Sequence, residues 1–161
     1  MRISMGIAIL ALACALSGCG DATSAPGGDT APDDPKQTLK QLVKHVGEGK
    51  SADACRLLVA GAQATFATEN EAKDCKTAMD VYAGKVTDGK KFAAYEPTGL
   101  EIRGETAKIG GSCAGWEAPF PKAERPGISP DTMGQFMLKK TDKGWFVNDY
   151  KGKQHFSSCG G

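Results

Sequence analysis

Cys19 follows an apolar N-terminal segment of the signal type, so only the residues after it are expected to form a folded domain. Residues 1–18 carry one basic residue, Arg2, and then an apolar run from Ile3 to Leu16 whose only polar side chain is Ser4. A charged start, an apolar core and small residues before a cleavage point are the parts of a secretory signal. About 14 helical residues span about 21 Å, less than the roughly 30 Å hydrocarbon core, so we do not expect a transmembrane helix.

The segment Leu16-Ser17-Gly18-Cys19 resembles the lipobox of bacterial lipoproteins. The resemblance covers only this signal, and it implies that the Cys19 thiol receives a diacylglyceryl group before cleavage directly in front of Cys19. Two acyl chains give stable membrane anchoring, whereas a single chain gives only marginal binding. The alternative is ordinary secretion with cleavage after Ala13 or Ala15, because both follow a small-x-small pattern.

Residues 19–34 are predicted to be a tether, and residues 35–161 a single domain. The segment from Gly20 to Asp34 holds Gly, Pro, Ser, Thr and Asp but no aromatic or large aliphatic residue, so it cannot bury enough apolar area to become ordered. Removal of residues 1–18 takes away Arg2 and no acidic residue, which lowers the formal charge from +1 to 0. A balanced charge argues against nucleic acid as a partner.

Four cysteines remain after Cys14 is cleaved off and Cys19 is lipidated: Cys55, Cys75, Cys113 and Cys159. An even number in an exported domain indicates disulfides. Zinc is the competing interpretation, but no two cysteines have the short spacing of a zinc site, and His45 and His155 lie far apart in sequence. We expect neither a metal nor a cofactor.

The first half of the domain has helical periodicity. Asp34 and Pro35 predict a helix start, and Leu39, Leu42, Val43 and Val46 follow on one face up to Gly47. A second helix is predicted from a Ser51 cap through Phe66. A third is predicted from the capping box Thr68-x-x-Glu71 to Gly84. Cys55 and Cys75 lie on the apolar faces of these two consecutive helices, so we favour the pairs Cys55–Cys75 and Cys113–Cys159.

The second half has strand periodicity. Leu100 and Ile102 alternate with polar residues, and Gly104-Glu105 can turn the chain. Ala107 and Ile109 then alternate on a returning antiparallel strand. A second hairpin runs through residues 135–138, the turn 141–144, and residues 145–147. Helices followed by antiparallel strands predict an α+β domain, with three N-terminal helices packed on one face of a curved sheet.

This order of elements resembles the nuclear transport factor 2-like superfamily, also called the cystatin-like cone. The resemblance rests on Phe136-x-Leu138-x-x-x-Asp142-x-Gly144-Trp145-x-Val147 and spans roughly residues 36–150. Ala52-Asp53-Ala54-Cys55-Arg56-Leu57-Leu58, with Cys75 following, is similar to small exported lipoproteins of the same superfamily. The resemblance implies a cone-shaped sheet around a helix with a pocket at its open end. Members include isomerases, cyclases, dehydratases and non-catalytic binding modules, so the fold alone does not decide the function.

His45 and Asp149 are the catalytic candidates. His45 lies on the flank of the first helix, where a solvent-exposed imidazole is favoured over a tuned general base. Asp149 shares strand parity with Trp145 and Val147, which would direct it inward, but a strand-end carboxylate in water is the favoured interpretation. Asp80 is expected on the exposed side of its helix. For His155, near the C-terminus, a structural or solvent role is expected.

Residues 114–132 form a long proline-rich loop that contains Trp116 and Phe120. Structureless loops of this length are uncommon in compact domains and are often functional. The two aromatic side chains either form an apolar lip over a ligand pocket or cover the end of the core, and both interpretations stay open.

We therefore expect a lipid-anchored module on the extracytoplasmic face of the cell membrane. It would bind a small apolar ligand or support an envelope protein without catalysis. The alternative is a small-molecule isomerase or cyclase with Asp149 or His45 as its base. A purely structural protein is a third possibility, and it predicts a large exposed apolar patch.

Overall fold

The computed structural model describes residues 30–109 and 115–152. Five α-helices precede the first strand: α1 Pro35–Gly47, α2 Ser51–Arg56, α3 Ala60–Glu69, α4 Cys75–Ala83 and α5 Gly89–Ala93. The strands are β1 Glu96–Pro97, β2 Glu101–Arg103, β3 Thr106–Ile109, β4 Trp116–Glu117, β5 Gln135–Thr141 and β6 Gly144–Lys151. Two 3₁₀ helices, η1 Lys122–Glu124 and η2 Pro130–Met133, lie between β4 and β5.

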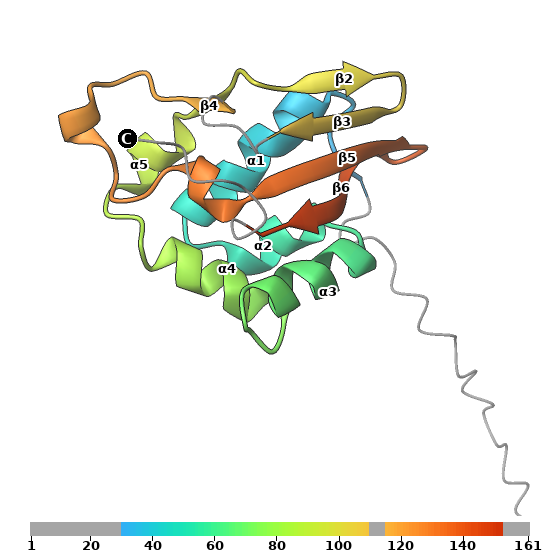
Figure 1. Cartoon of the computed structure of the whole chain (residues 1–161), viewed down its shortest axis with the longest axis horizontal. Helices are drawn as coiled ribbons and strands as arrows, with labels where there is room; N and C mark the ends of the chain where they lie inside the picture. The colour runs from blue at the N-terminus through green and yellow to red at the C-terminus, as the bar shows by residue number, and fades with distance from the viewer. Residues whose placement is uncertain (1–29, 110–114, 153–161) are drawn as a thin grey trace, which may run out of the picture.

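The predicted α+β class is confirmed. Strands β2, β3, β5 and β6 form an antiparallel sheet in that order, and β1 pairs with β4 in a separate two-stranded ribbon. Figure 1 shows α1 crossing behind the four-stranded sheet and α3 lying beyond β6 at the bottom of the view. The core lies between this helical layer and the sheet.

Helix α1 begins and packs as its sequence predicts. The Asp34 carboxylate accepts a hydrogen bond from the Lys36 N–H at 2.8 Å, and Pro35 occupies the first turn. A capping carboxylate satisfies one of the N–H groups that the first turn leaves free. The apolar face is buried, and its members are Leu39, Leu42, Val43 and Val46.

The prediction of one helix from Ser51 through Phe66 is wrong, because residues 57–59 pair with a strand. The Val147 N–H donates to the Leu57 carbonyl at 2.9 Å, and the Val59 N–H donates to the Val147 carbonyl at 2.9 Å. These bonds cover the edge of β6 that β5 leaves free, and an uncovered edge would be open to intermolecular pairing. The helix is therefore divided into α2 and α3. Ser51 is the first residue of α2, and the capping position is Lys50.

The capping box at Thr68 and Glu71 is also wrong. Thr68 lies in the last turn of α3, and Glu71 has a positive φ of 53° in the connection. The cap of helix α4 is Asp74, six residues after Thr68, and its carboxylate accepts a hydrogen bond from the Thr77 N–H at 2.7 Å. With α5 added, the described residues hold five α-helices where three were expected.

The Cys55–Cys75 disulfide is confirmed, and it joins α2 to α4. The two Cα atoms lie 6.0 Å apart, and both side chains are buried in the core. A bridge that closes a loop of 20 residues stabilises the fold by roughly 3 kcal/mol in the chain-entropy model. The second expected pair, Cys113–Cys159, lies outside the described residues.

Both hairpins form where the sequence predicts them. Gly104 has φ +59° in the turn between β2 and β3, and Thr141 pairs with Gly144 at the turn between β5 and β6. A β-bulge interrupts the second hairpin: Met137 pairs with Asp149 and Leu138 pairs with Val147, which leaves Asn148 as the extra residue. A bulge of this kind reverses which face of the sheet the following side chains take.

The end of the predicted tether is held against the sheet. The Ala31 N–H donates to the Lys143 carbonyl at 2.8 Å, and the Trp145 N–H donates to the Pro32 carbonyl at 2.8 Å. Gly144 permits this approach because a Cβ there would lie 2.1 Å from the Ala31 carbonyl oxygen. Its φ of +108° also favours glycine. The chain thus leaves the domain beside the β5–β6 turn.

We predict that Gly144→Ala lowers the free energy of unfolding by about 1–3 kcal/mol, because both the close approach and the backbone conformation are lost. Urea denaturation measures this change. Gly61→Ala is the control, since Gly61 is helical with open space around it and alanine favours helix there. An effect at Gly144 no larger than that at Gly61 would contradict this account of the docked segment.

Candidate ligand-binding site beneath the 115–133 loop

The segment from Gly115 to Met133, here called the covering loop, is held at its start and again near its middle. The Gly115 carbonyl accepts from the N–H groups of Thr98 and Gly99, each at 3.1 Å. Farther along, the Pro126 carbonyl accepts from the Thr87 N–H at 3.2 Å. The loop therefore has a defined path over the end of the core, seen at the left of Figure 1.

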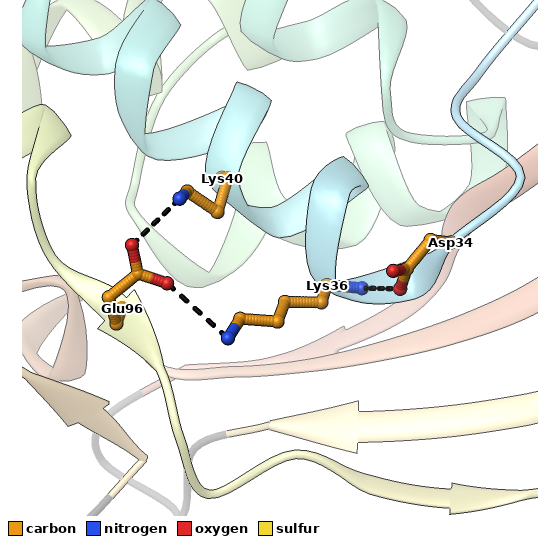
Figure 2. A network of polar contacts seen from close by, with 4 residues as sticks. All are labelled: Asp34, Lys36, Lys40 and Glu96. Carbon is orange, nitrogen blue, oxygen red and sulfur yellow. Dashed lines mark hydrogen bonds and ion pairs between the residues drawn. The ribbon is translucent and has the colours of Figure 1, made fainter.

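Strand β1, on which the loop rests, is tied to helix α1 by charge. Figure 2 shows the Glu96 carboxylate between two lysines of α1, with Lys40 Nζ at 2.7 Å and Lys36 Nζ at 3.4 Å. These ion pairs are partly exposed, so each contributes little to stability. Their role is positional, because β1 pairs with β4 and Pro97 lies opposite Trp116.

Three polar atoms, two of them in the covering loop itself, are buried without a hydrogen-bond partner among the described residues. They are the Tyr95 hydroxyl, Trp116 Nε1 and Asp131 Oδ1. Tyr95 is 1% exposed and Trp116 is 6% exposed. Because Pro97 faces Trp116 across the ribbon, Tyr95 is a diagonal neighbour of Trp116 on the same face, within reach of a large aromatic side chain. Unpartnered buried polar atoms are rare in folded proteins and indicate a missing partner or a functional role.

The Tyr95 ring is enclosed by two phenylalanines. The Phe120 ring meets it edge-on at 5.5 Å between centroids, and the Phe92 ring lies at 6.1 Å. Burial raises the pKa of the Tyr95 hydroxyl, Arg125 lowers it and Asp131 raises it further. Tyr95 is thus electrostatically coupled to one cation and one acid of the covering loop.

Asp131 is the acid that the fold places in this region. Burial raises the pKa of its carboxyl above the usual value, against the opposing effects of the Ser129 hydroxyl and the Arg125 charge. Asp131 lies in η2, directly after Pro130. A half-buried acid beside a buried tyrosine can accept and donate hydrogen bonds to a small polar group.

A hollow of about 360 Å³, which we call the loop hollow, opens at Trp116, and neither Tyr95 nor Asp131 is among its lining residues. It is lined by Thr98, Trp116, Glu117, Ala118 and Arg125. Trp116 and Ala118 supply apolar surface, Thr98 a hydroxyl, and Glu117 and Arg125 opposite charges. A few polar groups on an apolar lining are typical of small-molecule sites.

The two aromatic residues that the sequence singled out take different positions. Trp116 is part of the core cluster, as expected for a side chain that covers the core, yet it also lines the loop hollow. Phe120 is half-buried and packs against that cluster, with Lys91 Nζ 5.9 Å from its ring centroid. Trp116 therefore covers the end of the core and also borders the hollow, and its role as a lip over a ligand stays a prediction.

Asp149 lies in solvent, as the favoured interpretation had it. The bulge at Asn148 changes the strand parity, so Tyr150 takes the inward position and Asp149 the outward one. The Asp149 carboxylate accepts from the Tyr150 N–H at 2.8 Å. It borders a second hollow of about 360 Å³ on the open face of the sheet, here called the sheet hollow, with Glu101, Arg103, Lys108 and Lys139.

His45 is half-buried, which corrects the expectation that it lies in water. Burial lowers the pKa of its imidazole, although Asp53 and Glu48 act in the opposite direction. Its Nδ1 has no hydrogen-bond partner among the described residues. Asp80 is exposed as expected and pairs with Lys76 at 2.7 Å. Cys19, Cys113, His155 and Cys159 lie outside the described residues.

Sequence reasoning missed Tyr95, Arg125 and Asp131. Tyr95 stands alone between a five-residue helix and a two-residue strand, so no periodicity indicates its burial. The run Ser129-Pro130-Asp131 does carry a turn signal, which could have indicated an ordered segment within the loop.

Among residues 30–109 and 115–152, no helix is long and apolar enough to cross a membrane, and no cluster of His, Cys, Asp or Glu could hold a metal ion. Searches of protein-family models, curated proteins and solved structures found no match to the chain.

We predict opposite stability changes for two tyrosine-to-phenylalanine substitutions. In the ligand-free protein, Tyr95→Phe removes an unpartnered buried hydroxyl and raises the free energy of unfolding by about 1 kcal/mol. Tyr150→Phe removes a hydroxyl that donates to the Met133 carbonyl, and it lowers that energy by about 1–2 kcal/mol. Chemical denaturation of both variants measures the two signs. Destabilisation by Tyr95→Phe would show that its hydroxyl has a partner.

We also predict a pH dependence for Asp131. Because burial raises its pKa in the folded state, Asp131 favours folding at low pH, and this contribution is lost as pH rises above the usual carboxyl value. The stability of the wild type relative to Asp131→Asn should therefore fall between pH 3 and pH 7. Denaturation at several pH values measures it, and a constant or rising difference would contradict the burial of this acid.

Proposed function

We propose that the chain is a lipid-anchored, extracytoplasmic module that binds a ligand without catalysis. The observation that carries the proposal is the Cys55–Cys75 disulfide within the core. Disulfides form and persist in exported proteins and are rare in reducing compartments. This bridge therefore agrees with the export signal and the lipobox that the sequence predicts at Cys19.

The path of the chain before α1 supports the anchor. Ala31 and Pro32 are bonded to the β5–β6 turn, so the chain leaves the domain at a defined point. If the residues from Cys19 onward form the tether that their composition predicts, roughly a dozen of them would have an end-to-end distance of about 20 Å. The β5–β6 end of the sheet would then stay near the lipid surface, and the covering loop would remain accessible.

The cone architecture of the nuclear transport factor 2-like superfamily is part of this proposal. Helices packed on one face of an antiparallel sheet, together with a bulge that bends β6, support it. The loop hollow would be the ligand site. Its Trp116 and Ala118 surface suits a small, mostly apolar ligand, and Arg125 suits a single anionic or polar group on that ligand. An envelope protein is the other partner class.

An isomerase-like enzyme is the second candidate function. The observation that favours it is the coupling of Asp131, an acid with a raised pKa, to the buried hydroxyl of Tyr95. Perturbed pKa values gather at catalytic sites, although structural pairs show them too. The two bases predicted from sequence differ from this pair: Asp149 is exposed, and the pKa of the His45 imidazole is lowered by burial although Asp53 and Glu48 act in the opposite direction.

We predict that Cys19→Ser abolishes acylation and releases the exported chain from the membrane, because the thiol is the only acceptor that the lipobox provides. The full-length chain would be expressed in a bacterium that processes lipoproteins and followed by membrane fractionation and intact-mass spectrometry. Cys14→Ser is the matched control and should retain the lipid. An unacylated wild-type chain that begins near Leu16 would contradict the anchor.

A further inference from the structure

Strand β2 is the free edge of the four-stranded sheet within the described residues. The strand order is β2-β3-β5-β6, and only the opposite edge, β6, is covered by residues 57–59. Ile102, at the centre of β2, is 55% exposed. It pairs with Ala107, which is buried, so the Ile102 side chain lies on the helix-covered side of the sheet and beyond the helices that cover it.

The backbone of Ile102 points to the free edge. The two-residue turn at Gly104-Glu105 makes Arg103 and Thr106 a hydrogen-bonded pair, and this pattern alternates along an antiparallel hairpin. Ile102 and Ala107 then form a non-hydrogen-bonded pair. The N–H and carbonyl of Ile102 are therefore directed away from β3, where they can bond to another strand.

The side chains of β2 are self-complementary. If two copies of the strand pair antiparallel with Ile102 opposite Ile102, each Glu101 faces an Arg103 of the other copy. Glu101 already contacts Lys108 at 3.3 Å and Arg103 at 4.0 Å, but these pairs are exposed and weak. Strand β2 is short and charged, as edges protected from pairing often are, but in this one register its charges attract those of its copy.

We propose that β2 is a homodimer interface in which a second copy of this chain extends the sheet across a two-fold axis. The Ile102 backbone groups of the two copies exchange hydrogen bonds, the two Ile102 side chains cover one another, and two Glu101–Arg103 pairs form on the open face. The interface is small, so the association is weak in solution. If the chain is membrane-anchored as proposed above, confinement to one surface raises the effective concentration.

The dimer also joins the two sheet hollows. Glu101 and Arg103 border the hollow on the open face of each copy, beside Lys108, Lys139 and Asp149. Across the two-fold axis these borders become adjacent, so the two sheet hollows lie side by side. A partner larger than a single domain could then contact both copies.

Cysteine cross-linking in the full-length exported chain tests this interface. Cα atoms of a hydrogen-bonded antiparallel pair lie about 5.5 Å apart, within the range of a disulfide. We expect Ile102→Cys to give a covalent dimer on non-reducing gels of intact cells. Val81→Cys is the matched control, because Val81 is the other large hydrophobic residue exposed in the described part of the chain and lies on α4.

A charge exchange separates specific pairing from random collision. In the Ile102→Cys background, Glu101→Arg should lower the yield of the covalent dimer several-fold, and the further substitution Arg103→Glu should restore it. Equal cross-linking at positions 81 and 102, or cross-linking that ignores both charge changes, would overturn the proposal. Membrane fractionation of the same cells reports on acylation separately, so failure of the anchor is distinguished from failure of the interface.

Discussion

The disulfide between α2 and α4 is the constraint on which the arrangement of the helices and the sheet depends. Helix α2 has only six residues, too few to be stable by itself. The Cys55–Cys75 bridge holds it against α4, and the chain then continues directly into residues 57–59, which pair with β6. Val147 both donates to and accepts from this segment. One covalent bond thus fixes the element that joins the helical layer to the sheet.

Local patterns in the sequence predicted the elements whose partners are near in the chain. The predictions of the α1 apolar face, its Asp34 cap and the turns at Gly104 and Gly144 are confirmed, because each of these features depends on neighbouring residues. The break between α2 and α3 was missed because its cause, Val147, is almost ninety residues away. Thr68 matched a capping box in sequence, but the Asp74 carboxylate supplies the cap in the fold.

In the candidate site, contacts between residues far apart in the sequence decide even more of the structure. Trp116 was identified from its place in a long loop. Its burial beside Tyr95 follows from the pairing of β1 with β4, and strands of two residues are too short to give a periodic pattern in the sequence. Asp149 has inward parity in an unbroken strand, and the bulge at Asn148 reverses it. Asp131 is a candidate because the path of the covering loop over the core buries its carboxyl, and the sequence does not show that path. In each case the deciding contact is tertiary.

We propose above all that the folded chain carries an oxidised Cys55–Cys75 pair and works outside the reducing cytosol. Peptide mapping by mass spectrometry, under non-reducing conditions, of chain isolated from its natural source tests this most directly. The account predicts one cross-linked product that joins the peptide containing Cys55 to the peptide containing Cys75. Recovery of both cysteines as free thiols, or of Cys55 linked to a different cysteine, would contradict it.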